Sequence, residues 1–345
     1  MRGQMNKTHD SIYMDRKKKR MISNFLLLLT ACIWGVAFVA QSVGMDYIGP
    51  CTFAFSRFLI GGVVLIPVIL VMDKSRKKQV EKHYEDMTPT ERKYADILKT
   101  EGNTTEKIII EKAKKEQRIV TLAAGICCGT ALATASMAQQ YGIQYTSVGK
   151  AGFITTLYII IVPFLGLFVK KKVPLKVWIS ALIAMFGLYM ICMTESLQLS
   201  RGDAFVLLCA FLFSIQILLV DYFSPKADPV KISCVQFFTC AVICGVCAVI
   251  FETPSWGGIV AAGIPILYAG VMSSGVAYTL QVVAQRNTDP TVASLIMSLE
   301  SVIATLAGWV LLNQHLSAIE LGGCALVFTA IVLTQLPDRK KKINA

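Results

Sequence analysis

The sequence predicts an all-α integral membrane protein with ten transmembrane helices, arranged as two inverted five-helix repeats with both termini in the cytosol. Three observations predict this fold class. Hydrophobic residues make up 54% of the 345 residues and charged residues only 16%, a balance that a soluble domain of this size does not have. The apolar residues form segments of membrane-spanning length, with the basic residues almost all on one side of them. The second half of the chain also repeats the pattern of the first.

Ten apolar segments are long enough to cross a bilayer, which takes about 20 apolar residues in a helix. Segments this long and continuously apolar are expected to be helices, because backbone groups in lipid need hydrogen bonds within the segment. Residues 1–20 precede them as a polar tail that we expect to be disordered. The first run lacks a small-residue cleavage site and is longer than a signal peptide, so it is expected to remain as a helix. The predicted helices span residues 22–42, 51–72, 119–139, 147–169, 176–194, 203–221, 230–250, 263–284, 291–312 and 318–336.

The basic residues predict the orientation of these helices. All but three of the 34 Lys and Arg residues lie in the tails or in the even-numbered loops. Cytoplasmic loops carry an excess of Lys and Arg, so both termini are expected to be cytosolic. The same distribution explains the net charge of +12 without nucleic acid, because no basic face with interleaved aromatic residues is present. Membrane lipid is therefore the expected partner of this charge.

Residues 73–118 form one long charged insertion on the cytosolic side. It is expected to form short charged helices, with Pro89, Gly102 and Asn103 as breaks. A solvated excursion without a core is the simpler interpretation, because few of its residues are apolar. The alternative is that the insertion binds a regulator or the inner leaflet. That alternative would make the protein a membrane sensor or scaffold whose cytosolic insertion binds a partner.

An internal repeat is indicated by equal helix spacing and by a few matched residues. Pro50 aligns with Pro229 at one spacing, and Thr155 aligns with Ser298 at a shorter one, as expected if the insertion lengthens only the first half. An odd number of helices per repeat makes the second repeat enter the membrane from the opposite side, an arrangement common in secondary transporters. The predicted organisation is a tail over 1–20, a first repeat over 21–194, a second repeat over 203–336 and a basic tail over 337–345.

Glu300 is the only acidic residue near the centre of a predicted helix. A charge at that depth is costly in lipid, so the side chain is expected to face a cavity or a partner. Small residues at helical spacing from it, among them Ala293, Ala304 and Ala307, favour an inward face. Burial of a carboxyl group favours its protonated form, which suits a residue that carries protons. A structural hydrogen bond is the alternative role.

Lys150 and Arg57 are basic residues inside predicted helices. Lys150 lies near the outer end of its helix, where it either attracts an anionic group, neutralises Glu300 or extends toward the headgroups. The helical rise separates it from Glu300 by about 10 Å along the membrane normal, which argues against an intimate ion pair. Arg57 either binds a carboxylate or phosphate or anchors its helix at the interface. Together they are expected to shape an electropositive outer vestibule.

Aromatic and amide groups at comparable depth complete the candidate solute site, although each of them taken singly is better explained by helix packing. These candidates are Trp34, Tyr158, Gln216, Tyr278 and Gln281.

The sequence contains no Walker motif, no H-E-x-x-H and no credible Ser/His/Asp set. We therefore expect neither enzyme activity nor ATP-driven pumping. No cofactor or metal is expected. The pair Cys244 and Cys247 is best explained as small packing residues, like most of the 11 cysteines. Gly125-x-x-x-Gly129 favours either a homodimer or, more simply, close packing within the bundle.

Residues 34–58, 144–168 and 289–312 resemble the EamA-type transporters of the drug/metabolite transporter superfamily. The resemblance covers most of both halves but neither the N-terminal tail nor the insertion. It implies a ten-helix carrier of the bacterial cytoplasmic membrane, with two inverted repeats. It also implies export or exchange of small metabolites, amino acids or drugs, often coupled to an ion gradient.

The same resemblance points to individual residues, and the sequence departs from the family pattern at two places. Ser301 stands where such segments commonly have proline, and Leu312-Asn313-Gln314 replaces a usual Leu-Gly-Glu ending. The missing glutamate leaves Glu300 as the expected coupling group. We therefore expect a secondary transporter that moves a small polar metabolite by alternating access, with Glu300 binding and releasing a proton. The recurrent positions of the pattern are Trp34, Arg57, Lys150 and Glu300.

Overall fold

The computed structural model describes residues 2–85, 104–146, 148–171, 173–192, 200–312 and 317–335. Over these residues the chain is helical and has no strand. The elements in chain order are α1 (Arg2–Gly44), α2 (Pro50–Glu85), α4 (Thr104–Ile143), α5 (Val148–Thr155), α6 (Tyr158–Phe168), α7 (Leu175–Cys192), α8 (Arg201–Phe223), α9 (Pro229–Phe251), α10 (Trp256–Ala261), α11 (Gly263–Leu267), the π-helical η1 (Tyr268–Tyr278), α12 (Thr279–Gln285), α13 (Pro290–Met297), α14 (Leu299–Leu312) and α15 (Ala318–Gln335).

The apolar helical spans are those expected of a multi-pass membrane protein. Within the described residues, eight helical spans are long and apolar enough to cross a membrane. Two shorter apolar helices, Leu175–Met190 and Ala318–Thr334, lie where the sequence predicts the two remaining segments. The eight longer spans are Lys18–Gly44, Pro50–Gln79, Glu111–Ile143, Val148–Phe168, Arg201–Phe223, Pro229–Phe251, Gly263–Gln285 and Pro290–Leu311.

Several helices start at local capping signals in the sequence. α9 and α13 each begin with a proline behind an aspartate, and Asp228 and Asp289 accept hydrogen bonds from N–H groups of the first turn. Proline suits this position because its missing N–H would have no partner within the helix. Ser200 and Asp203 form a capping box at the start of α8, in which each side chain accepts from the other residue's backbone N–H.

Two spans are broken, which corrects the expectation of continuous helices over residues 147–169 and 291–312. The first break lies at residues 156–157, between α5 and α6, and the second at Ser298, between α13 and α14. The Thr156 hydroxyl donates to the carbonyl three residues earlier at 2.8 Å, and the Ser298 hydroxyl does the same at 2.7 Å. Such bonds compete with the regular backbone pattern and bend helices.

The span over residues 263–284 is also irregular, because η1 lies between α11 and α12. π-Helical turns are rare and occur mostly at functional sites. Two carbonyl groups of η1 contact α1. The Trp34 indole donates to Ser273 O at 3.3 Å, and the Thr30 hydroxyl lies 3.2 Å from Ala277 O and 2.9 Å from Leu26 O of its own helix. The irregular backbone of η1 therefore fixes the position of α1.

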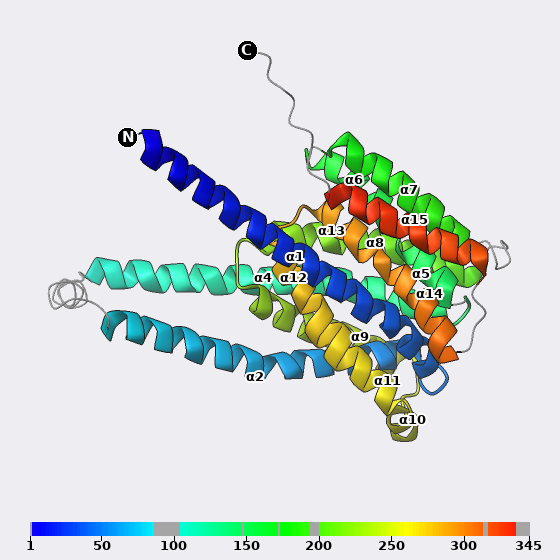
Figure 1. Cartoon of the computed structure of the whole chain (residues 1–345). Helices are drawn as coiled ribbons and strands as arrows, with labels where there is room; N and C mark the ends of the chain where they lie inside the picture. The colour runs from blue at the N-terminus through cyan, green and yellow to red at the C-terminus, as the bar shows by residue number, and fades with distance from the viewer. Residues whose placement is uncertain are drawn as a thin grey trace, which may run out of the picture.

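Helix packing brings segments from both halves of the chain together (Figure 1). α2 lies against α9, α4 against α8 and α9, α7 against α15, and α1 against α14 and η1. The α4–α9 contact is close because a Cβ atom on Gly125 would lie 2.4 Å from Val235 Cβ, and one on Gly129 would lie 2.7 Å from Thr239 Cβ. The G-x-x-x-G face thus packs inside the bundle, in agreement with the simpler of its two interpretations.

Three helices extend beyond their apolar spans, unlike the sequence-based expectation (Figure 1). α1 continues back to Arg2, where a disordered tail was expected over residues 1–20. α2 continues to Glu85 and α4 starts at Thr104, so the described parts of the insertion continue the membrane helices instead of forming separate short ones. A helix elongates easily once it is nucleated, and these extensions contain no proline.

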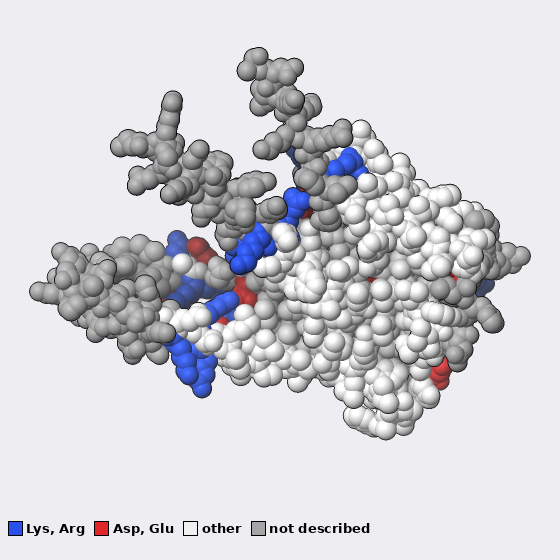
Figure 2. Space-filling model, viewed as in Figure 1, with Lys and Arg blue, Asp and Glu red and all other residues white. Residues whose placement is uncertain are grey.

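The rest of the insertion, with its expected breaks at Pro89, Gly102 and Asn103, lies outside the described residues. Figure 2 shows Lys and Arg side chains gathered where the extended helices leave the bundle, beside a broad uncharged surface.

Candidate functional site

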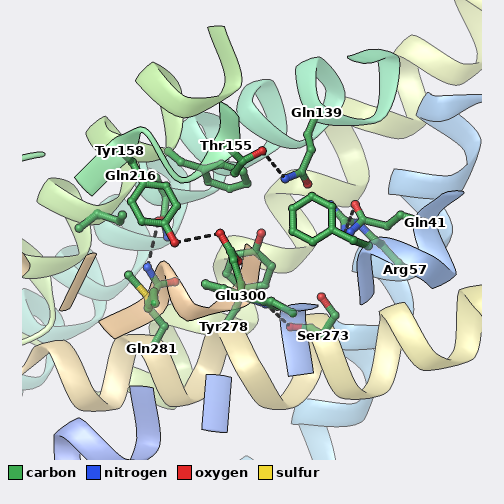
Figure 3. Close-up of a pocket in the computed structure, with 15 residues that line it drawn as sticks. Gln41, Arg57, Gln139, Thr155, Tyr158, Gln216, Ser273, Tyr278, Gln281 and Glu300 are labelled. Atoms are coloured by element: carbon green, nitrogen blue, oxygen red, sulfur yellow. Dashed lines mark hydrogen bonds between the residues drawn. The ribbon is translucent and has the colours of Figure 1, made fainter. Parts of the chain in front are cut away.

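A narrow pocket, with a cavity volume of about 30 Å³, lies between segments of both halves. All of the sequence-predicted site residues except Lys150 line it. Figure 3 shows the polar side chains converging from several helices. The lining residues are Trp34, Phe38, Gln41, Arg57, Gln139, Thr155, Tyr158, Phe213, Gln216, Ile217, Ser273, Tyr278, Gln281, Met297 and Glu300.

Glu300 reaches the pocket because the break at Ser298 ends α13 just before it. The side chain is only 4% exposed, and the Tyr158 hydroxyl donates to Glu300 Oε1 at 2.8 Å. Tyr158 is the first residue of α6, directly after the other helix break. A Cβ atom on Gly35 would lie 2.7 Å from Glu300 O, so the glycine allows α1 to approach α14 at this point. The two breaks thus bring a carboxyl group and a phenol together.

Arg57 enters the same pocket from α2 and is 1% exposed. Its NH1 group donates to Gln41 Oε1 at 3.2 Å, and its guanidinium lies 4.6 Å from the centre of the Phe58 ring. Nε and NH2 have no hydrogen-bond partner. No described carboxylate forms an ion pair with Arg57. Buried donors without partners are costly, so this guanidinium is poised for an anionic group in the pocket.

Aromatic rings form one wall of the pocket. The centres of the Trp34 and Tyr278 rings are 4.5 Å apart, and those of Tyr278 and Phe58 are 6.3 Å apart. The hydrogen bond from Trp34 to Ser273 O in η1 fixes the indole. This wall offers an apolar and polarizable surface to a bound solute.

Two glutamines form a second polar group in the pocket. Gln281 Nε2 donates to Gln216 Oε1 at 3.3 Å, while Gln216 Nε2 and Gln281 Oε1 have no partner. Both side chains are at most 1% exposed. The pair therefore offers one donor and one acceptor.

The sequence does not single out Gln41 or Gln139 as pocket residues. Both lie at the ends of predicted apolar segments, where an amide resembles an ordinary interfacial residue. In the structure, Gln41 accepts from Arg57, and Gln139 Nε2 donates to Thr155 Oγ1 at 3.4 Å. The signal available for Gln41 was its place seven residues after Trp34, which puts both side chains on the same face of α1.

Lys150 lies outside the pocket, in an ion pair that the sequence did not predict. Its Nζ is 2.6 Å from Asp203 Oδ2, and the two side chains are 16% and 2% exposed. Asp203 also accepts from the Thr146 hydroxyl at 2.9 Å and from Ser200 N at 2.8 Å. The ion pair joins α5 to the start of α8. Lys150 is thus held by a carboxylate, and neither neutralises Glu300 nor simply extends toward the headgroups.

Replacing Lys150 with Met is expected to lower the free energy of unfolding by about 1–3 kcal/mol, because the buried Asp203 carboxylate loses its cationic partner. The measurement is the melting temperature of the purified protein in detergent. Lys112→Met, on an exposed position of α4, is the matched control. Adding Asp203→Asn should recover part of the loss, since the amide leaves no buried charge. An unchanged melting temperature, together with weaker solute binding, would instead place Lys150 on the solute path.

The described residues contain no group of three or more His, Cys, Asp or Glu side chains that could hold a metal ion. The cysteines described in the structure are all free. Cys240 donates its thiol to Gly129 O at 3.1 Å, within the α4–α9 contact.

Comparison with known proteins adds to this geometry. The model of the EamA-like transporter family matches residues 21–84, 107–193 and 200–336. An uncharacterized transporter of Archaeoglobus fulgidus is 24% identical over 319 residues, which cover 92% of this chain and 87% of the relative. The uncharacterized transporter YoaV of Bacillus subtilis is 22% identical over 324 residues, which cover 92% of this chain and 98% of the relative.

One solved crystal structure superposes with a TM-score of 0.67 over 91% of this chain and 96% of the other, at 14% identity, and so shares the fold. The match to the family model covers both halves of the sequence. The chain therefore belongs to the EamA-like transporter family and is a multi-pass membrane transporter.

Proposed function

We propose that the protein is a secondary transporter of the bacterial cytoplasmic membrane, which exports or exchanges a small polar solute by alternating access and couples it to protons. The proposed solute site is the pocket lined by Arg57 and Glu300. Both termini are proposed to be cytosolic, on the side where the basic residues lie.

The observation that carries this proposal is that Arg57 and Glu300 are both almost fully buried in one pocket without pairing with each other. Two buried ionisable groups that do not pair with each other lower the stability of the fold, because each loses its hydration without gaining a partner. Ionisable residues within membrane spans mark solute or ion paths. The pocket therefore has the character of a site whose charged partners arrive with the solute.

The proposed inverted repeats, residues 21–194 and 203–336, are supported by the helix contacts. α1 lies against α13 and α14, and its counterpart α8 lies against α5 and α6; α2 lies against η1, and its counterpart α9 lies against α4. Phe58 of α2 stacks on Phe237 of α9, with 6.2 Å between the ring centres. The helix breaks also occur at nearly equivalent places in the two halves. In such folds the solute site lies between the repeats, as this pocket does.

Proton coupling is proposed to act through Glu300. The Tyr158 hydroxyl donates to one carboxylate oxygen, and Arg57 and Tyr278 lie elsewhere around the pocket. When the pocket is empty, a bound proton removes the unpaired charge of Glu300 from the low-dielectric interior. A solute with a cationic group replaces that proton. Glu300 thus binds either a proton or the solute, which is the requirement for exchange.

Access to the pocket requires helix movement, because its polar lining residues are nearly all buried. The broken helices are the proposed moving elements. They touch at Ser301, whose hydroxyl lies 2.8 Å from Gly152 O and 3.0 Å from Thr156 Oγ1. A serine at this position links the two breaks by hydrogen bonds, which a proline would not do.

Proteoliposomes with a pH-sensitive dye inside test the proposal. Gradients of individual amino acids, organic acids, amines and sugars are imposed in turn. We expect at least one class to drive proton movement that is absent from protein-free vesicles. Solute flux without proton movement would contradict the coupling, and a protein that moves no member of the panel would contradict the transport function.

A further inference from the structure

We infer that α2 and α9 move as one rigid body, against which the broken helices α5–α6 and α13–α14 move. One polar contact at each end of the two helices holds them together. Arg57 on α2 then belongs to a fixed wall of the pocket, while Glu300 moves with α14. The inference rests on the proposed alternating access and states which helices carry it out.

At one end of the pair, Glu252 of α9 caps the first turn of α2. Its carboxylate accepts from the N–H groups of Cys51 and Thr52 at 2.7 and 2.9 Å, and from the Thr52 hydroxyl at 2.6 Å. The first N–H groups of a helix have no partner within it, and an anion is favoured at this position. A Cβ atom on Gly49 would lie 2.3 Å from Glu252 Cδ, so the glycine leaves room for the carboxylate.

At the other end, acidic and basic residues of α2 and α9 form ion pairs. Lys231, in the first turn of α9, places Nζ 2.9 Å from Asp73 Oδ2 of α2. One turn further along α2, Arg76 NH2 lies 2.7 Å from Oδ2 of Asp228, the N-cap residue of α9. Each helix therefore holds the first turn of the other.

The internal repeat relates these two end contacts. Glu252 follows Asp73 at the spacing that relates the first prolines of α9 and α2. Lys231 follows Thr52 at the same spacing. The helical rise puts Thr52 and Asp73 about 30 Å apart, which is the thickness of the hydrocarbon core of a bilayer. One contact is thus expected at each face of the membrane.

Close packing joins α2 to α9 between the two ends. A Cβ atom on Gly62 of α2 would lie 3.1 Å from the Phe238 ring, and one on Gly245 of α9 would lie 2.9 Å from the Phe55 ring. The Cys234 thiol also lies 3.8 Å from Gly62 O. Interdigitated side chains resist sliding and tilting, so a change in the angle between the two helices would break this packing and an end contact.

The position of the pocket shows that the end contacts are not gates. None of the described residues of α9 lines the pocket, whereas α2 contributes Arg57. Parting α2 from α9 at either end would therefore not open a path to the pocket. The broken helices, in contrast, contribute Thr155, Tyr158, Met297 and Glu300 to its lining.

Helix α4 joins α8 to the same fixed part, because it packs closely on both α8 and α9. A Cβ atom on Gly142 of α4 would lie 2.3 Å from Val206 Cγ2 of α8. The ion pair between Lys171, just after α6, and Asp221 of α8 thus links a moving helix to the fixed part. This ion pair has to open during transport, whereas that between Asp73 and Lys231 stays closed.

Cross-linking with a short bismaleimide in proteoliposomes tests this difference. Asp73→Cys with Lys231→Cys fixes α2 to α9, and Lys171→Cys with Asp221→Cys fixes α6 to α8. We expect the first cross-link to leave solute-driven proton movement unchanged and the second to lower it to the level of protein-free vesicles. The four single-cysteine variants, treated in the same way, control for reaction of the native cysteines. Loss of movement with the first cross-link, or full movement with the second, would overturn the inference.

Hydrogen exchange of the purified protein gives a second readout that needs no solute. The N–H groups of Cys51 and Thr52 should exchange about 100-fold or more slowly than in Glu252→Ala, because a cap that stays closed protects them. Glu116→Ala, at an exposed position of α4, is the control and should leave their exchange unchanged. Equally fast exchange in Glu252→Ala and the unmodified protein would show that the cap opens. If the proteoliposome panel reveals no transported solute, the proposed function fails, and hydrogen exchange alone decides whether α2 and α9 form a rigid pair.

Discussion

Glu300→Gln is expected to abolish solute-driven proton movement in proteoliposomes, down to the level of protein-free vesicles. The amide has the size of the carboxyl group and still accepts a hydrogen bond from Tyr158, but it does not bind or release a proton. The measurement is the change in internal pH when the solute gradient is imposed. Binding of a solute ammonium should also weaken by about 10–100-fold, because the charge is lost.

Two further readouts keep this result interpretable. Glu116→Gln, at an exposed position of α4, should show the same solute-driven proton movement as the unmodified protein. The melting temperature of Glu300→Gln without solute should not fall, since the neutral amide costs about as little in a buried pocket as the protonated carboxyl group that it replaces. Undiminished coupling in Glu300→Gln would refute the role assigned to this residue.

Arg57→Gln is expected to weaken solute binding without lowering the stability of the empty protein. Affinity for a solute carboxylate should fall by about 10–100-fold or more, because the two unpartnered donors are its proposed partners. Stability of the empty protein should stay unchanged or rise by about 1–3 kcal/mol, since the substitution removes buried donors without partners. The measurements are calorimetric binding and the melting temperature without solute.

Arg118→Gln, on the exposed part of α4, is the control for this substitution. A variant of Arg57 that melts well below the unmodified protein yet binds the solute normally would show that the arginine holds helices together. It would then have no part in solute recognition.

Most of the fold was predictable because long apolar segments in lipid have few alternatives to helices. The helix breaks were not predictable from hydropathy, since Thr156 and Ser298 are small and compatible with a membrane helix. Their effect depends on hydroxyl bonds to particular carbonyl groups. The extension of α2 and α4 into the insertion was missed because charged residues were taken to end the helices, although no proline does so.

The pocket was predictable in part for a physical reason. A charged or amide side chain in a membrane span is expected to face the interior of the helix bundle and not the lipid. This expectation selects Arg57, Glu300, Gln216 and Gln281. Lys150 met the same criterion but has a different partner. Asp203 lies at the start of a predicted helix, where it resembled a boundary residue, and only the packing of α5 against α8 brings the two charges together.

The central claim is that Glu300 exchanges a proton for the solute in the Arg57 pocket. Its most direct test is the number of protons that the purified protein releases when it binds a solute that drives proton movement in the proteoliposome panel. The measurement is made in weakly buffered solution at a series of pH values. We expect release to approach one proton per bound solute at the lower pH values and to vanish at the higher ones. Solute binding without proton release at any pH would contradict the account.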